Sequence, residues 1–572
     1  MLPSPPPLTW RVKDPTPRAA QALARALGLP PLAAQLLCHR GYSDPAEARR
    51  FLSPGLEQLP PPEQMLGLPQ AVEVLLPAMR AGACIGVAGD YDADGVTATA
   101  LLVEFFRACG CPVVWDLPHR LDDGYGFKPP RARRLAQAGA EIIVTADCGI
   151  SDHQGVAEAT RLGLPVVVSD HHLLPPGPLV PAAAVVNPKQ EACRLSAHLA
   201  GVGVAFYLAA GLRAALRDAG FFASRPEPNL RRSLDLVALG TCADVVPLVE
   251  ANRVLVAEGL KVLAEGRRPG LSALARAAGR GGPLDTMDLG FYLAPRINAA
   301  GRLAHPGPAL ELLLSNDPGE AARRAQALDR LNSERRKVEN AIFEQVLEQL
   351  GRDPALQDAG ALVLGAEGWH QGVLGIVAGR LLERTGRPSM LFAVRNGTAV
   401  GSGRSREGFH LQRALAANAE LLEHYGGHAL AAGATLPSAS LPELAQRLAQ
   451  AAAEQLPVQE ARLLHIESEV RLGELGPEML EPLSRLAPFG QANPEPRLAV
   501  RGAKVGSAKV VGDKHLKINL IQDGASLPAI AFNCSQDWIA PGVELEAAFI
   551  PRVSTYGRPH IELVLEDIQP AA

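Results

Sequence analysis

Three aspartates in five residues, Asp90, Asp92 and Asp94, form a dense group of side chains that could bind metal. They follow the apolar run 84–88, which is typical of a buried strand, and precede an apolar, helix-like run over 96–107. Side chains two positions apart in an extended chain point the same way, so we expect the three carboxylates to converge. Convergent anions repel one another unless a cation holds them, and oxygen ligands favour Mg2+ or Mn2+. An acidic turn or a helix cap is the alternative.

A parallel sheet is predicted to position these carboxylates, because strand-like and helix-like segments alternate from about residue 71 to 188. Strands are expected at 85–88, 112–117, 142–145, 166–169 and 184–186, with helices over 132–139 and 154–162. The carboxyl ends of parallel strands lie along one edge, where ligands bind in open α/β sheets. The polar residues that follow these strands include Arg120, Asp147, Asp170, His171 and His172.

Asp147, His171 and His172 are therefore candidate metal ligands, and Asp170 can instead orient one of the histidines. A single histidine is more often a satisfied polar residue than a ligand, but two behind an aspartate favour metal binding. Asp244 lies in the nearly uncharged run 236–248, where an unpaired carboxylate is costly. It is a further candidate ligand, with a helix cap as the alternative.

These motifs resemble the four motifs of the DHH phosphoesterase superfamily, and the fuller forms at 89–95 and 243–248 are similar to its RecJ family of single-strand-specific 5′→3′ DNA exonucleases. Other branches of the superfamily carry a histidine four residues before the Asp-x-Asp pair, where this chain has Ala88. The resemblance implies that one or two Mn2+ or Mg2+ ions are held by Asp92, Asp94, Asp147, His171 and Asp244, and that Asp90 and His172 assist catalysis.

Further segments resemble the DNA-binding parts of this family. Segment 293–303 is similar to the stretch that lines the DNA path, with a solvated loop as the alternative. An α/β unit from about 360 to 455, with strands at 361–364 and 389–394, looks like the DHHA1 domain. Its segments 401–406 and 425–433 suit phosphate, the second through glycines and a histidine ahead of a small-residue helix. The implied substrate-binding residues are Arg120, Arg296, Asn298, Arg302, Ser402, Arg404, Gly427 and His428.

The chain is long enough for several domains. We expect an α/β protein: an N-terminal appendage (1–50) packed on the first domain, a parallel-sheet DHH domain (51–305), a connecting long helix (306–352), a smaller DHHA1 domain (353–460) and an OB-fold-like β-barrel (461–572). Asp317 and Pro318 are good start signals for the long helix. The barrel strands are expected at 497–500, 504–511, 517–520, 529–532, 544–551 and 561–565.

A basic run in the barrel, Arg501, Lys504, Lys509, Lys514 and Lys517, suits single-stranded nucleic acid, with a solvated face as the alternative. The net charge of −4 gives no support to binding by the chain as a whole. The composition, 47% hydrophobic and 20% charged, is that of a soluble globular protein. Eight scattered cysteines, no membrane-length apolar run and no signal-like N-terminus predict a cytoplasmic protein that does not bind membranes.

The motifs predict a metal-dependent phosphoesterase, and the resemblance implies an exonuclease that degrades single-stranded DNA from its 5′ end, releasing nucleoside 5′-monophosphates in DNA repair and recombination. The alternatives are a phosphodiesterase for dinucleotides or short oligonucleotides and a non-catalytic single-strand-binding scaffold. Single-stranded DNA is the expected partner, a single-strand-binding protein and a helicase are candidate further partners, and a monomer is expected.

Overall fold

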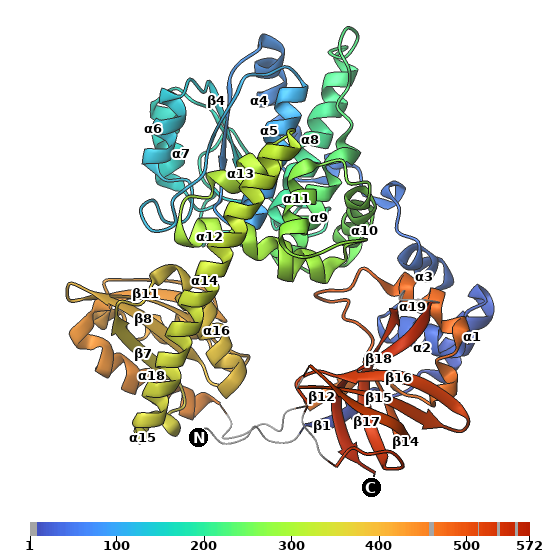
Figure 1. Ribbon diagram of the computed structural model, residues 1–572. Coiled ribbons are helices and arrows are strands. Elements are labelled where there is room, and N and C mark those ends of the chain that lie inside the picture. Colours follow the sequence, from blue (N-terminus) through green and yellow to red (C-terminus); the bar gives the residue numbers. More distant parts are fainter. Residues whose placement is uncertain (1–7, 457–462, 513, 535–537, 555–558, 572) are drawn as a thin grey trace.

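Three bodies make up the structure, and the long helix α14 (Pro318–Arg352) connects the first two (Figure 1). The computed structural model describes residues 8–456, 463–512, 514–534, 538–554 and 559–571. The first body contains a five-stranded parallel sheet, the second a five-stranded mixed sheet and the third a β-barrel. Among the described residues, no helix is both long and apolar enough to cross a membrane.

The parallel sheet of the first body has the strand order β3-β2-β4-β5-β6, and its strands confirm the five that were predicted. Every neighbouring pair is parallel, so all five carboxyl ends lie at one edge. Both faces are covered: Ile142 and Val144 pack into one core and Ile143 into another. The strands are β2 (Ile85–Gly89), β3 (Val113–Asp116), β4 (Ile142–Ala146), β5 (Val166–Ser169) and β6 (Ala184–Val186).

Helices cover both faces of this sheet, as in doubly wound folds. One face carries α6 (Pro129–Gln137) and α7 (His153–Arg161), and the other carries α4 (Leu68–Ala81), α5 (Ala93–Ala108) and α8 (Gly201–Asp218). The nearly uncharged run 236–248 is helical only as far as Ala243, where α9 (Leu234–Ala243) ends with Asp244 as its C-cap. Segment 293–303 forms a helix and not a loop. The remaining helices of this body are α10 (Glu250–Ala264), α11 (Pro269–Ala277), the π-helix η4 (Asp288–Leu293), α12 (Ala294–Leu303) and α13 (Gly307–Leu314).

Helix α14 begins where the sequence predicted, with the Asp317 carboxylate accepting the N–H of Glu320 and Pro318 in the first turn. Its 35 residues extend over roughly 50 Å. Ala325 and Leu328 lie in the core of the first body, whereas other α14 side chains, including Ile342, Val346 and Leu350, lie in a core of the second. One rigid element therefore fixes the distance between the two bodies.

The second body is a mixed sheet of order β10-β11-β9-β8-β7, which confirms the two predicted strands in β7 (Leu362–Glu367) and β8 (Ser389–Arg395). The small-residue helix predicted after His428 is wrong, because β10 (His424–Gly427) and β11 (Ala431–Pro437) form a hairpin. Alternate side chains of β11 are buried, a pattern of period two that its small-residue composition conceals. The other elements are β9 (Thr398–Arg404), α15 (Pro354–Gln357), α16 (Leu374–Thr385), α17 (Leu411–Ala416) and α18 (Leu441–Gln455).

The third body is a barrel closed by pairing of β14 with β17. The two predicted strands 497–500 and 504–511 are one continuous strand, β14 (Leu498–Val511). Its register shifts between Val500 and Ala503, where Gly502 has a φ of 65°, and such a bulge bends a strand without ending it. The other strands are β13 (Ser468–Glu469), β15 (His515–Gln522), β16 (Ala525–Ala531), β17 (Glu544–Ser554) and β18 (His560–Pro570), and α19 (Leu480–Leu486) precedes β14.

The N-terminal helices pack on this barrel, so the prediction that they pack on the first domain is wrong. Helices α1 (Pro17–Leu27), α2 (Pro31–His39) and α3 (Pro45–Leu52) share one core with the barrel strands. Strand β1 (Thr9–Val12) pairs in parallel with β12 (Leu463–Ile466). Thr9 pairs with Leu463, so the two strands lie about 450 residues apart and local patterns could not reveal the contact.

Arg253 of α10 ties the first body to the third. It is 3% exposed, and its guanidinium lies 3.6 Å from the ring centre of Phe51. It donates hydrogen bonds to the carbonyl of Phe51 and to the four successive carbonyls of residues 485–488. Charge-assisted bonds made in a buried place hold the two bodies in one arrangement.

Candidate active site

Three overlapping groups of potential metal ligands meet at the carboxyl edge of the first sheet. Within each group the ligand atoms lie within 4.8 Å of one another. The groups are Asp90, Asp92 and Asp147; Asp94, His171 and Asp244; and Asp147, His171 and His172. The seven side chains predicted to act in catalysis are thus brought together.

Asp90, Asp92 and Asp94 do not converge through an extended chain, as the sequence predicted. The chain is not extended across them, because β2 ends at Gly89 and Asp92 is the N-cap of α5, where it accepts the N–H of Gly95. Asp94 lies in the first turn of that helix and belongs to a different ligand group from Asp90. A helix start, rather than the pleat of a strand, therefore distributes these carboxylates between two groups.

His171 presents one nitrogen to the carboxylates. Its Nδ1 is 3.0 Å from the carbonyl oxygen of Leu199, so a neutral ring donates from Nδ1 and leaves a lone pair on Nε2. That Nε2 lies 3.1 Å from Oδ1 of Asp147 and 3.6 Å from Oδ2 of Asp244. Burial and the charge of His172 lower the pKa of His171 to about 3. The ring is therefore neutral at physiological pH, the form that ligates metals.

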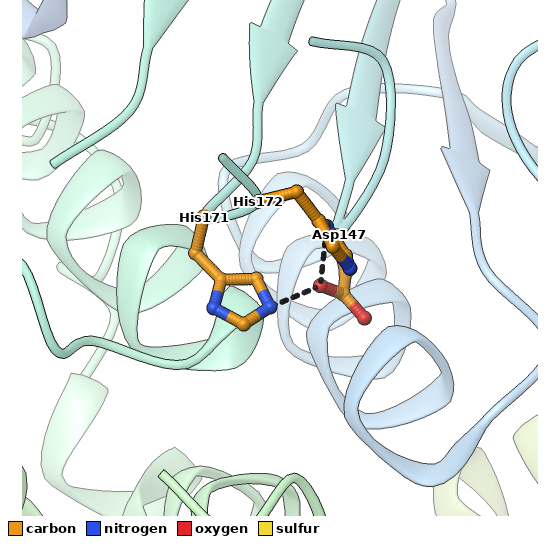
Figure 2. A group of neighbouring side chains, drawn as sticks. All are labelled: Asp147, His171 and His172. Carbon is orange, nitrogen blue, oxygen red and sulfur yellow. Dashed lines mark ion pairs between the residues drawn. The ribbon is translucent and has the colours of Figure 1, made fainter. Parts of the chain in front are cut away.

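His172 has different hydrogen-bond partners and a different protonation state, although it lies next to His171 at the same strand end (Figure 2). Its Nδ1 is 2.7 Å from Oδ1 of the fully buried Asp170 and 3.1 Å from the Tyr125 hydroxyl. Burial alone would lower the pKa of His172, but its hydrogen bond to Asp170 and the charge of that carboxylate raise it to about 9. His172 is therefore protonated near neutral pH and can donate a proton.

The amino end of α8 anchors Asp94. Its carboxylate accepts the N–H groups of Gly201, at 2.6 Å, and Val202, at 2.9 Å, which are the free donors of the helix start. A Cβ on Gly201 would lie 2.4 Å from Oδ1 of Asp147, so only glycine fits beside both carboxylates. Sequence reasoning missed Gly201 and Tyr125; the small-residue run 200–203 at a helix start was the available signal for the first.

The electrostatics of the site favour a bound cation. Burial first, and then the charges of neighbouring aspartates, raise the pKa values of Asp94 and Asp147 well above their usual range. Burial and Asp92 raise the pKa values of Asp90 and Asp244 to about 7. The Oδ1 atoms of Asp90 and Asp147 are buried without a hydrogen-bond partner.

The contact between Asp147 and His171 points to the same conclusion. When Asp147 is ionised and the His171 proton is on Nδ1, Nε2 of His171 and Oδ1 of Asp147 face each other at 3.1 Å with only lone pairs between them. A divalent ion that accepts both lone pairs removes this repulsion. The mixed oxygen and imidazole donors fit Mn2+ or Mg2+, with Mn2+ the better match to nitrogen.

A second, cationic cluster lies where the first two bodies meet. Burial, and then the charges of Arg120, Arg335 and Arg404, lower the pKa of Arg302 to about 9. Burial and Arg120 also lower the pKa of Arg404. The Nε of Arg120 is buried without a partner, and its guanidinium lies 4.3 Å from the ring centre of Tyr91. Guanidinium groups held close enough to repel one another form a site for an anion.

Ser402 and Arg404 place this cluster at the start of α16. A Cβ built on Gly375 would lie 3.0 Å from both Oγ of Ser402 and Nη2 of Arg404, so both side chains pass directly over the first turn of the helix. Arg302 donates to the carbonyl of Gly372, just before that turn. Helix N–H groups add to the attraction for an anion here.

The other residues predicted to bind substrate are either bonded within the protein or lie away from the arginine cluster. Arg296 is 7% exposed and pairs with Asp329 of α14, so its charge is already engaged within the protein. Asn298 accepts the N–H of Ala93 and braces the turn that carries the aspartates. Gly427 and His428 are exposed in the β10–β11 hairpin, two strands away from Arg404 in the sheet.

The basic run of the barrel is only partly available. Arg501 pairs with Glu469 and Glu546, and Lys517 lies 3.8 Å from Glu562. Among the described residues of this run, three exposed lysines form no ion pair: Lys504, Lys509 and Lys514. All three lie on β14 or in the turn that follows it.

Known families match all three bodies. The family model described as the DHH family, N-terminal domain, matches residues 84–241, the DHHA1 domain matches residues 358–454 and the RecJ OB domain matches residues 466–567. The single-stranded-DNA-specific exonuclease RecJ of Salmonella typhimurium is 40% identical over 566 residues, covering 95% of this chain and 96% of that protein. The protein of the same name from Thermus thermophilus is 38% identical over 513 residues, covering 89% of this chain and 72% of that protein.

Two solved structures are also similar along almost the whole chain. RecJ of Thermus thermophilus in complex with Mn2+ has a TM-score of 0.83 and 34% identity, covering 99% of this chain and 80% of that one. RecJ of the same organism in complex with Mg2+ has a TM-score of 0.78 and 33% identity, covering 99% of this chain and 79% of that one. These are the two ions that the donor set fits best.

Metal binding should weaken as the pH falls below about 7, because protons then compete for Asp244, whose pKa is raised to about 7. We expect the Mn2+ dissociation constant to rise about tenfold per pH unit for each proton displaced. In the metal-free protein a raised carboxyl pKa means that stability is lost as the pH rises through that pKa. The increase in Tm caused by Mn2+ should therefore grow from pH 6 to pH 8. Calorimetric titrations and thermal melts test this, and an affinity that does not change over that range would contradict it.

Proposed function

The chain belongs to the RecJ family of DHH phosphoesterases, and on this premise we propose that it degrades single-stranded DNA from the 5′ end, releasing nucleoside 5′-monophosphates. The observation that best supports this proposal is a pair of side-chain clusters in the first two bodies. One is acidic and suited to Mn2+ or Mg2+, the other is a group of mutually repelling arginines, and α14 fixes their separation. A phosphate held by the arginines places a nearby phosphodiester at the metal site.

Asp92, Asp94, Asp147, His171 and Asp244 are the residues that we propose to hold the ions. When bound, Mn2+ or Mg2+ activates a water molecule and neutralises charge on the phosphodiester. Asp90, whose pKa is raised to about 7, accepts the proton of the attacking water on its unpartnered Oδ1. The bond from phosphorus to the 3′ oxygen breaks, and protonated His172 donates its proton to that oxygen.

The direction of degradation follows from the arginine cluster. A strand end carries a phosphate with more charge and free oxygens than an internal linkage, and several guanidinium groups favour that end. We propose that Arg120, Arg302, Ser402 and Arg404 hold the 5′-terminal phosphate. His428 and Gly427 are proposed to contact the strand nearby. Arg296 and Asn298 act instead by supporting the site, since their polar groups are bonded within the protein.

Two other functions are less well supported. A phosphodiesterase for dinucleotides needs no basic surface remote from its active site, yet Lys504, Lys509 and Lys514 are exposed on the barrel. A non-catalytic scaffold needs no complete ligand set, yet all seven acidic and histidine side chains meet here. We further propose a monomer in the cytoplasm that cooperates with a single-strand-binding protein and a helicase in repair and recombination, which sedimentation and pull-down experiments test.

The proposed function is tested with oligonucleotides labelled at either end. Wild-type protein with Mn2+ should release the 5′ label first, as a mononucleotide, and should leave double-stranded DNA intact. Asp147→Ala should abolish cleavage while single-strand binding persists, because the strand is held by residues outside the metal site. Loss of a needed ligand costs several kcal/mol of transition-state stabilisation, so a variant retaining more than about a tenth of the wild-type rate would refute the ligand assignment.

Arg404 is expected to bind the 5′-terminal phosphate of the strand. Arg404→Ala should slow cleavage of 5′-phosphorylated strands more than of 5′-hydroxyl strands, with the difference shrinking by about 1.5–3 kcal/mol. The measurement is the single-turnover rate on both substrates. Arg395→Ala removes an exposed arginine from the same sheet and serves as the control. Equal losses on both substrates would mean that Arg404 contacts the internal backbone or supports the fold.

We propose that the barrel binds the strand beyond the active site. Changing Lys504, Lys509 and Lys514 together to Gln should weaken binding of long strands more than cleavage of short ones. The slope of log affinity against log salt should fall by about 2, because each phosphate contact on a single strand contributes about 0.7. A variant of Lys13, which follows β1, and of Lys261, which lies on α10, is the control. An unchanged slope would assign these lysines to a solvated face.

A further inference from the structure

Lys189 is a charged residue at the active-site edge that the proposed chemistry does not use. It follows β6, the strand at the opposite end of the sheet from β3, after which Arg120 comes. Its backbone N–H donates to Oδ1 of Asn187, and Nδ2 of Asn187 donates to the carbonyl of His172. Asn187 is fully buried, so the turn that carries Lys189 is tied directly to the metal site.

A second side chain braces the same turn. Nε2 of Gln190 donates to the carbonyls of Val185 and Asn187, and more weakly to that of Leu66. The backbone on either side of Lys189 is therefore held by hydrogen bonds. Among the described residues, the Lys189 ammonium forms no ion pair, although its side chain is half-buried.

The ammonium acts electrostatically on the acidic cluster. Partial burial lowers the pKa of Lys189, and the carboxylates of Asp244, Asp170 and Asp147 oppose that change. Lys189 in turn lowers the pKa values of Asp244 and His171. A positive charge therefore lies at the border of the metal site without being bonded to any carboxylate in it.

The strand order of the sheet gives the order of these side chains along its carboxyl edge. Along the carboxyl edge come Arg120 after β3, the aspartates after β2, Asp147 after β4, the histidines after β5 and Lys189 after β6. Four intervals of about 4.8 Å give a length of roughly 19 Å. That length accommodates several successive phosphates of an extended single strand. Cations thus lie at both ends of the row and the metal ligands lie in the middle.

We infer that Lys189 binds the phosphate that follows the scissile linkage on its 3′ side. This inference rests on the proposed function, in which Arg120 and its neighbours hold the 5′-terminal phosphate and the metal ligands face the first linkage. The strand then runs from β3 towards β6, and its second linkage reaches the braced turn. Lys189 is a substrate-positioning residue that selects for a chain continuing beyond the leaving mononucleotide.

The test combines a change in the protein with a change in the DNA. The substrate is a 5′-phosphorylated oligonucleotide in which a neutral methylphosphonate replaces one linkage, either the second or the fifth. First-cleavage rates are measured under single-turnover conditions with Mn2+. Lys189→Ala should slow cleavage of the unmodified strand about 10- to 100-fold, and a methylphosphonate at the second linkage should slow the wild type similarly. Because both changes remove the same contact, together they should cost no more than either alone.

The controls separate this inference from the proposed function. Lys189→Arg should restore most of the rate, and Lys261→Ala, an exposed lysine on α10, should leave it unchanged. A methylphosphonate at the fifth linkage should have the same effect in wild type and in Lys189→Ala. If wild-type protein fails to cleave from the 5′ end, the proposed function is wrong. If it does cleave from the 5′ end, the two changes can be compared. Rate losses that multiply when Lys189→Ala is combined with a methylphosphonate at the second linkage would mean that Lys189 acts elsewhere, and the inference would be overturned.

Discussion

Carboxylates buried against one another are the constraint on which the rest of this structure depends. Asp147 is 2% exposed, and its pKa is raised first by burial and then by the charges of Asp94, Asp92, Asp90 and Asp244. Such a group is tolerated only if it is protonated, paired or bound to a cation. Binding of a divalent metal removes this repulsion. The repulsion between buried carboxylates that destabilises the metal-free site therefore favours binding of Mn2+ or Mg2+.

The protein frame holds the carboxylates in place while leaving Oδ1 of Asp90 and Oδ1 of Asp147 without a hydrogen-bond partner. The amino end of α8 binds Asp94, and the fully buried Arg131 stabilises the end of β2 by donating to the carbonyls of Gly89 and Gly126 and to Asp116. Neither group fills the position between Asp147 and His171 where the lone pairs meet. Backbone and guanidinium donors therefore offset part of the charge, and the rest is left for the metal.

The positive charge that we propose to bind the strand outside this site comes from several elements. Arg302 comes from α12, Arg404 from β9 of the second body, and the free lysines from the barrel. Such a layout works only if the bodies keep their relative positions, because a misplaced phosphate would miss the metal ligands. The continuous helix α14 and the buried Arg253 supply that rigidity on the two sides of the first body.

The sequence by itself determined the features that depend on neighbours along the chain. Short apolar runs that alternate with helix-like segments specified five parallel strands, and the Asp or His residues after four of them specified side chains at the carboxyl edge, because strand period and turn chemistry are local properties. Asp317 and Pro318 likewise specified the start of α14. The order of motifs was sufficient to identify the superfamily, and with it the acidic and histidine members of the site.

Only the tertiary structure decided what depends on pairing across long distances. The N-terminal helices lie on the barrel because they share its core, and β1 pairs with the distant β12. The glycine-rich segment after Tyr425 is a hairpin because β9 offers it an edge, which outweighs any local helical tendency. The resemblance of segment 293–303 predicted that Arg296 binds DNA. In the structure Arg296 forms an ion pair with Asp329 on another helix. Gly201 and Lys189 gained their roles from side chains folded against them, since a residue's neighbours in space are fixed by packing and not by its own sequence environment.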